Sequence, residues 1–230
     1  MSGLFIECDQ LVKEDGGKRS LSGVSATFRP GITYLIGDNG AGKSTLLRLL
    51  TTIIRPTKGR LRFREYDQNR SAEEAWRDLP LREVRQTIGY LPQHFIGYPE
   101  MTTSAYLYHQ ALQKGISART AGRELDAWLT DASLLAERGT KLEQLSAGQR
   151  QRVGLLQAML GNPRVCLLDE PFESFDIMEA MLFRYRIQQL ARRSTVIIST
   201  HRLEWMDEGE QDRVIELAEG RIINSSVLGN

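Results

Sequence analysis

The stretch Gly37-Asp38-Asn39-Gly40-Ala41-Gly42-Lys43-Ser44 decides the fold of this chain of 230 residues. It fits the pattern of Gly, four free positions, and then Gly-Lys-Ser or Gly-Lys-Thr, which binds phosphate groups in proteins. An apolar run at residues 32–36 precedes it and is typical of a β-strand, while apolar residues at helical spacing follow it from Leu46 to Ile54. Strand, loop and helix come in the order that the pattern requires, so we expect an α/β fold.

The residue types of this loop suit a polyphosphate ligand. Glycines allow a turn so tight that successive N–H groups point at an anion, and the helix expected to begin near Lys43 adds the positive end of its dipole. Lys43 would reach the terminal phosphates, and the hydroxyl of Ser44 would ligate Mg²⁺. A chance match is the alternative, and the flanking elements argue against it. The predicted nucleotide-binding residues are Gly37, Asp38, Asn39, Gly40, Ala41, Gly42, Lys43, Ser44 and Thr45.

The composition is that of one compact folded body. Apolar residues make up 41% of the chain, which is enough for a substantial core, and 30 Lys and Arg residues nearly balance 29 Asp and Glu residues. Without a basic excess, nucleic acid is not an expected partner. Cys8 and Cys166 lack metal-site spacing, which favours a reducing intracellular compartment. The sequence has no recognisable signal peptide or membrane span, so membrane association would need a partner.

Residues 165–168 form a short apolar run that is typical of a buried parallel strand, and Asp169 and Glu170 follow at its carboxyl end. Active sites of open α/β sheets lie at that end of the strands. Asp169 would hold the hydration shell of Mg²⁺, and Glu170 would polarise the attacking water. A solvated loop is the alternative for an isolated Asp-Glu pair, but the phosphate loop upstream favours the functional interpretation.

Two single polar residues follow β-rich runs in a similar way. His201 comes directly after residues 195–200, whose composition is that of a strand, and Gln93 follows Tyr90-Leu91-Pro92. On its own, such a His is usually a structural hydrogen-bonding residue, and such a Gln carries no information. Their order among the other motifs favours a position beside the same crevice.

The run Leu145-Ser146-Ala147-Gly148-Gln149 is a candidate helix start. Ser146 followed by Gln149 has the spacing of a capping box, and the helix would end at Gly161. Its free N–H groups and dipole would form an anion site, while Gly148 removes a side chain that would keep a phosphate at a distance. A simple helix cap is the alternative. The apolar residues on one face of this helix are Val153, Leu156 and Leu160.

In this order the motifs resemble those of the ATP-binding cassette (ABC) family, and residues 145–149 are similar to its signature sequence. The resemblance runs from about Leu4 to Ile223. It implies a P-loop NTPase of the ABC ATPase type, with a mostly parallel core sheet flanked by helices, an antiparallel β subdomain and a helical subdomain. We therefore expect one domain over residues 1–230, with the core and β subdomain at 1–93 and 151–230 and the helical signature subdomain at 94–150.

The resemblance also implies a role for each motif. The catalytic residues would be Glu170, His201, Gln93 and Lys43. The cofactors would be ATP and Mg²⁺, and the metal ligands would be Ser44, Gln93 and Asp169. In a dimer, the residues that act on the partner's nucleotide or cross the interface would be Ser146, Gly148, Gln149 and Asp176. Gln93 would also contact the attacking water, and His201 the γ-phosphate.

Residues 94–150 contain two helical patterns. One apolar stripe consists of Ala121, Leu125, Trp128, Leu129 and Ala132, and a weaker one, ended by Gly115, consists of Ala105, Tyr108 and Leu112. In the family, this region receives the membrane subunit. Candidates for that contact are Phe95, Ile96, Tyr98 and Pro99, with packing beneath the subdomain as the alternative. Residues up to Phe28 and residues 60–63 are expected to form the antiparallel strands.

Three positions depart from the family pattern. Asp15 stands where the family usually has an aromatic residue that stacks on adenine, which puts selectivity for ATP over GTP in doubt. The segment Phe172-Glu173-Ser174-Phe175 replaces the small residues that the family usually has ahead of Asp176, so we expect bulkier dimer contacts there. Ala147 replaces a glycine of the signature, and its methyl group should be tolerated.

The function implied is that of an ATP-hydrolysing subunit that dimerises on Mg·ATP and drives transport through integral membrane permease subunits. The second ATPase subunit would be a copy of this chain or a paralogue, and both would lie on the cytoplasmic face of the cell membrane. Residues 89–102 resemble the exporter branch of the family, of the ABC-2 type. Two alternatives stay open: a soluble ABC ATPase acting on ribosomes or DNA, and a nucleotide-sensing module without turnover.

Overall fold

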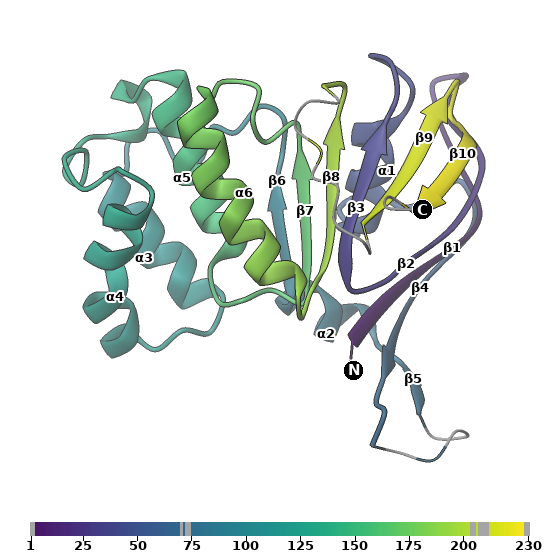
Figure 1. Ribbon diagram of the computed structural model, residues 1–230, viewed down its shortest axis with the longest axis horizontal. Coiled ribbons are helices and arrows are strands. Elements are labelled where there is room, and N and C mark those ends of the chain that lie inside the picture. The colour runs from purple at the N-terminus through teal and green to yellow at the C-terminus, as the bar shows by residue number, and fades with distance from the viewer. Residues whose placement is uncertain (1–2, 70, 72–74, 203–205, 207–211, 228–230) are drawn as a thin grey trace.

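A core sheet with helices packed against it and a second, antiparallel sheet beside it form the molecule (Figure 1). The computed structural model describes residues 3–69, 71, 75–202, 206 and 212–227. The ends of the expected domain, at residues 1 and 230, lie outside the described residues.

The core sheet is mostly parallel. Its strands are β3 (Gly31–Ile36), β6 (Ile88–Leu91), β7 (Val165–Asp169), β8 (Thr195–Thr200), β9 (Arg213–Ala218) and β10 (Arg221–Val227), in the order β10-β9-β3-β8-β7-β6. Only β10 is antiparallel to its neighbour. The carboxyl ends of β3, β6, β7 and β8 therefore lie along one edge, where ligand sites of such sheets occur.

The second sheet flanks the phosphate loop, as expected. Its strands are β1 (Gly3–Asp15), β2 (Lys18–Phe28), β4 (Lys58–Tyr66) and β5 (Trp76–Asp78), in the antiparallel order β2-β1-β4-β5. Gly16 and Gly17 form the turn between β1 and β2 with φ angles of 57° and 82°, which L-residues with side chains rarely adopt.

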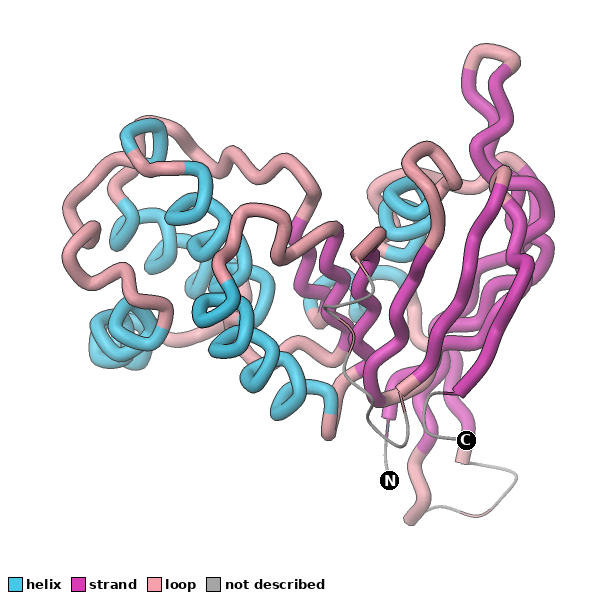
Figure 2. Tube along the Cα trace, turned by 45° about the horizontal axis from the view of Figure 1, so that its top comes forward, coloured by secondary structure: helices cyan, strands magenta, loops and turns pink. Residues whose placement is uncertain are grey.

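Four of the described helices begin after a Ser, Thr or Asp residue that caps their N-terminus. The helices are α1 (Lys43–Leu50), α2 (Leu81–Gln86), α3 (Thr103–Gln113), α4 (Ala118–Asp131), α5 (Ala147–Met159) and α6 (Ile177–Ala191). The side chains of Thr102, Ser117, Ser146 and Asp176 each accept a hydrogen bond from a backbone N–H in the first turn of α3, α4, α5 and α6. Figure 2 shows α6 running along one face of the core sheet.

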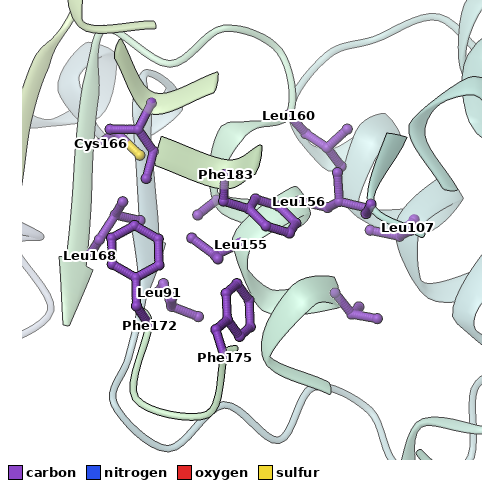
Figure 3. Packing of buried hydrophobic residues seen from close by; sticks show 14 of the residues in the cluster. Leu91, Leu107, Leu155, Leu156, Leu160, Cys166, Leu168, Phe172, Phe175 and Phe183 are labelled. Atoms are coloured by element: carbon purple, nitrogen blue, oxygen red, sulfur yellow. The ribbon is translucent and has the colours of Figure 1, made fainter. Parts of the chain in front are cut away.

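The two faces of the core sheet are buried in separate hydrophobic clusters. Along β7, Cys166 and Leu168 face α5 and α6, while Val165 and Leu167 face α1 and the antiparallel sheet. Figure 3 shows the first cluster, in which Phe183 of α6 packs beside Leu155 of α5. Burial on both sides explains why these strands read as continuous apolar runs, and it confirms the expected fold class.

The helix after the phosphate loop is shorter than its apolar spacing predicts. It ends at Leu50, Thr52 has a φ of 62°, and Ile53 is 65% exposed. The hydroxyl of Thr51 donates to the carbonyl of Arg48 and accepts from the N–H of Ile53. These local bonds compete with continued helix, so the pattern overestimates its length.

The buried face of α3 also differs from the predicted stripe. Its buried residues are Thr103, Tyr106, Leu107 and Ala111, whereas Ala105 and Leu112 are exposed. Two stripes offset by one residue fit this sequence, and packing of α3 on α4 and α5 selects the one with Tyr106 and Leu107. The stripe predicted for α4 is confirmed, since Ala121, Leu125 and Leu129 are buried.

Both cysteines are free and buried, and burial raises the pKa of each thiol to about 12. Within the described part of the chain, none of the helices has the length and apolar character needed to cross a bilayer.

Candidate functional site

The phosphate loop leaves the carboxyl end of β3 and turns into α1. Gly42 precedes the helix with a φ of 108°, and a Cβ atom there would lie 2.6 Å from the carbonyl oxygen of Ser20. Only glycine fits both constraints. Ser44 and Thr45 occupy the first turn of α1, so the structure places the predicted loop residues around one helix N-terminus.

Lys43 is folded back over the loop. Its Nζ donates to the carbonyl oxygens of Gly37 at 2.6 Å and Asp38 at 3.2 Å, and it lies 3.9 Å from Oε1 of Glu170. The side chain is buried, so its charge is poorly hydrated. A phosphate in the loop would replace the carbonyl oxygens as the acceptor for this ammonium group.

Glu170 is held in a defined position between two nitrogen groups. Its Oε1 lies 3.0 Å from Nδ1 of His201 and 3.9 Å from Nζ of Lys43, and its side chain is 7% exposed. The backbone has a φ of 48°, which is uncommon for a residue with a side chain. Its N–H donates to the carbonyl and hydroxyl oxygens of Ser199. The carboxylate is therefore placed to accept a proton at the mouth of the loop.

Asp169 is also fixed by Ser199. Its Oδ1 accepts a hydrogen bond of 2.5 Å from the Ser199 hydroxyl, and both residues are buried. Burial, and then the negative charge of Asp169, raise the pKa of Tyr90 to about 12. The sequence reasoning missed Ser199, although a hydroxyl inside the apolar run of β8 is a sign of a buried hydrogen bond.

The residues predicted to hold Mg²⁺ fit that ion by chemistry. They supply a hydroxyl from Ser44, a carboxylate from Asp169 and an amide oxygen from Gln93, and Mg²⁺ prefers oxygen ligands. Gln93 lies two residues beyond β6, whose Leu91 is aligned with Leu168 of β7. Among the described residues, the hydrogen bonds and ion pairs join Glu170 to Lys43 and His201, and none joins Gln93 to these three.

The signature segment forms the helix start that its sequence predicts. The Ser146 hydroxyl accepts from the N–H of Gln149, and Oε1 of Gln149 accepts from the N–H of Ser146. The amide nitrogen of Gln149 also donates to Glu137 at 2.8 Å, so both ends of this side chain are occupied. A Cβ atom on Gly148 would lie 3.2 Å from the carbonyl oxygen of Ser174, which adds a packing reason for glycine.

Gln151 is a second residue that the sequence reasoning missed. It lies on the buried side of α5, and its amide nitrogen donates to the carbonyl oxygen of Pro171 at 3.2 Å and reaches that of Glu170 at 3.5 Å. The signal was a polar residue in a buried stripe with Gly154, Leu155 and Ala158.

Comparison with known proteins decides the family. A family model described as ABC transporter matches residues 21–173. The chain belongs to the ABC transporter family. It is an ABC ATPase domain, as its motifs predict.

Two curated relatives of the cassette differ in the transport that their names describe. The human retinal-specific phospholipid-transporting ATPase ABCA4 is 32% identical over 222 residues, which are 92% of this chain and 9% of that protein. The methionine import ATP-binding protein MetN of Corynebacterium diphtheriae is 30% identical over 230 residues, which are 97% of this chain and 66% of that protein. The chain thus spans only part of the length of these relatives.

A solved structure confirms the fold of the cassette. The dimeric structure of MJ0796, a bacterial ABC transporter cassette, superposes with a TM-score of 0.81 and 24% sequence identity. The match covers 98% of this chain and 99% of that chain.

The segment between Pro171 and Asp176 buries its two aromatic rings and exposes the residues between them. Phe172 and Phe175 are buried and turn inward toward the cluster around Phe183 (Figure 3), while Glu173 and Ser174 are exposed. The first hydrophobic cluster takes up the two rings, which leaves Glu173 and Ser174 as the exposed residues ahead of Asp176, and bulkier dimer contacts in this segment stay a prediction. Asp176 caps α6 through the N–H of Glu179.

A cleft of about 560 Å³ separates the segment after β6 from the start of α5. Its lining includes Gln93, Ile96, Pro99, Arg150, Gln151 and Ser174. Phe95 packs against the core, since Gly154 leaves room for its ring. Ile96, Tyr98 and Pro99 are exposed, so they are the ones available to a partner.

Asp15 is the last residue of β1, next to the exposed turn into β2, and Lys13 pairs with it at 2.7 Å. The carboxylate is 74% exposed. An ion pair therefore occupies the position at which the family usually has an aromatic ring.

Proposed function

We propose that this cassette binds Mg·ATP, closes as a dimer with a second ABC ATPase subunit, and hydrolyses ATP to drive transport through separate integral membrane permease subunits. The second subunit would be another copy of this chain or a paralogue. The proposal rests on the family of the chain and on the arrangement of two anion-binding helix starts, which one chain leaves incomplete.

The main support for the proposal is the distance between the phosphate loop and the signature helix. Both start at the same edge of the core sheet, but they lie beside different strands. The loop follows β3, whereas α5 packs on β6 and β7 (Figure 1). Because β8 and β7 stand between β3 and β6, those two strands are about 14 Å apart at the usual spacing. A nucleotide on the loop of one chain would therefore need the signature of another chain to cover it.

The chemistry proposed for the site is hydrolysis of the bond between the β–γ bridging oxygen and the γ-phosphorus. Glu170 would accept the proton of the attacking water, whose oxygen forms the new bond to the γ-phosphorus as ADP leaves. Lys43 and His201 would bind the γ-phosphate oxygens. Ser44, Asp169 and Gln93 would hold Mg²⁺, which would supply positive charge to offset the negative charge of the phosphates.

We assign the cassette to export, at the cytoplasmic face of the cell membrane, because residues 89–102 resemble the exporter branch. Exposed Ile96 and Pro99, which line the cleft beside Gln93, give a permease an apolar contact next to the nucleotide site.

Replacing Glu170 by Gln tests the catalytic part of the proposal. We expect turnover to fall at least about 100-fold, because the amide cannot accept the proton, while dimerisation on Mg·ATP survives. Steady-state phosphate release and size-exclusion chromatography with ATP measure the two effects. Glu173→Gln, which changes an exposed carboxylate in the same segment, is the matched control. Retained turnover in Glu170→Gln would refute Glu170 as the base.

Co-purification tests the transport part. A permease recovered with the wild-type cassette, and reduced when Ile96 is replaced by Glu, would support it. Recovery of ribosomes or DNA without any membrane protein would contradict it and favour a soluble cassette ATPase.

A further inference from the structure

Gln151 connects the signature helix to the backbone of the proposed catalytic base. Its amide nitrogen bonds the carbonyl oxygen of Pro171 at 3.2 Å and lies 3.5 Å from that of Glu170. The side chain is buried, so these contacts are shielded from water. Gln151 is in the second turn of α5, five positions after Ser146.

The backbone that Gln151 holds is an uncommon one. Glu170 has a φ of 48°, and such a conformation persists only when its surroundings fix it. Ser199 fixes it from the β8 side by accepting the N–H of Glu170. Gln151 fixes it from the α5 side through the carbonyl groups. The direction of the Glu170 side chain therefore depends on the position of α5.

The first two turns of α5 also contact the segment after Glu170 at two further points. Gly148 lies against the carbonyl oxygen of Ser174, with room for no more than a tight Cβ contact at 3.2 Å. Arg152 pairs with Glu179 in the first turn of α6 at 3.4 Å. A shift of the signature would thus be passed along residues 170–179, and the only side-chain hydrogen bond from α5 to Glu170 and Pro171 in the described structure comes from Gln151.

We infer that Gln151 is a positioning residue that makes the placement of Glu170 depend on whether the signature of the same chain is engaged. This inference rests on the proposed dimer, in which that signature covers the nucleotide held by the partner, whereas Glu170 acts on the nucleotide held by its own Lys43. Gln151 therefore couples the two nucleotide sites. Such a coupling acts in both directions, so it appears as cooperativity between the sites.

The test replaces Gln151 by Met, which keeps the length of the side chain and removes the donor. We expect kcat to fall about 10-fold, as for one lost buried hydrogen bond that orients a catalytic group, with ATP affinity of the monomer unchanged. The Hill coefficient for ATP should fall below the wild-type value, and the part of it that ATP-dependent dimerisation produces should remain. ATP titrations of turnover and of monomer binding give these quantities.

The matched control is Gln157→Met on the same helix. Gln157 donates to the carbonyl oxygen of Tyr90 at 2.6 Å, so its loss also removes one amide–carbonyl bond between α5 and the core. Similar losses of stability are expected for both variants, but only Gln151→Met should change kcat and cooperativity. Equal kinetic effects in the two variants, or unchanged cooperativity in Gln151→Met, would overturn the inference. Failure of Glu170 as the base would appear separately, as retained turnover in Glu170→Gln.

Discussion

The phosphate loop and the signature segment each lead into a helix N-terminus suited to an anion. Only the phosphate loop is surrounded by charged side chains from other parts of the chain. Lys43, Glu170 and His201 close around the loop from three separate elements. At the start of α5, Ser146 and Ala147 are exposed, and the side chain of Gln149 is occupied by the cap and by Glu137. Similar local chemistry thus gives a nearly complete site in one place and half of a site in the other.

The largest effect is expected when the phosphate loop is mutated in one chain and the signature in another. This tests whether the two segments complete one site between two chains. Lys43→Ala removes the ammonium group that we propose binds the phosphates, and Ser146→Arg fills the exposed helix start. Each variant alone should have background turnover. In a mixture, the mixed dimer has one site with both wild-type halves. We expect turnover to return to at most about a quarter of wild type, given random pairing and one intact site per mixed dimer.

Phosphate release from the two variants, separately and mixed, measures this recovery. The coupling inferred for Gln151 lowers it further, because the intact site relies on a base whose own signature is damaged. No recovery at any mixing ratio, with mixed dimers demonstrated by differently tagged subunits, would show that loop and signature act within one chain. Monomeric Lys43→Ala should also lose most ATP binding, whereas monomeric Ser146→Arg should retain it.

A smaller effect is expected on the side of the phosphate loop, at Asp15. Lys13 and Asp15 lie in the hairpin beside the loop, since Leu21, the strand partner of Lys13, contacts the Gly42 position. Asp15→Tyr would provide a ring for the base to stack on, and we expect ATP and GTP affinity to rise about 5- to 10-fold.

Equilibrium binding of ATP, GTP and inorganic tripolyphosphate to the monomer measures the effect. Asp15→Asn removes the charge without adding a ring and is the control. An equal gain for tripolyphosphate, which has no base, would show that the change is electrostatic and not stacking.

The sequence predicted the parts of the site that depend on local pattern. The phosphate loop, the acidic end of β7 and the capping box at Ser146 are each made of residues that lie within a few positions in sequence, and each forms the local structure that its pattern predicts. Ser199 and Gln151 were missed because their partners are 19 to 30 positions away in sequence. Such contacts follow from the packing of α5 and β8 on β7, which no short motif encodes.

The errors in the fold have a related cause. In α3, adjacent stripes are equally apolar, and tertiary packing chooses between them. Phe172 and Phe175 are bulky by sequence, but their burial depends on the hydrophobic cluster that they join with residues of α5 and α6 (Figure 3). The sequence shows which side chains are apolar enough to be buried. The packing of the neighbouring helices and strands decides which of those side chains are buried.

The smallest effect is expected within the signature itself, at Ala147. This residue begins α5 with its methyl group exposed, and the close contact of the segment is made by Gly148. Ala147→Gly should therefore lower the free energy of unfolding by at most about 1 kcal/mol, because glycine loses more backbone entropy in the helix, and leave turnover unchanged. Gly148→Ala is the matched comparison. Its Cβ atom would press on the carbonyl of Ser174, so turnover should fall clearly while the free energy of unfolding changes little. Urea unfolding measures the stability of both variants, and phosphate release measures their turnover. A larger loss of turnover in Ala147→Gly than in Gly148→Ala would mean that the methyl group at position 147 contacts the partner's nucleotide.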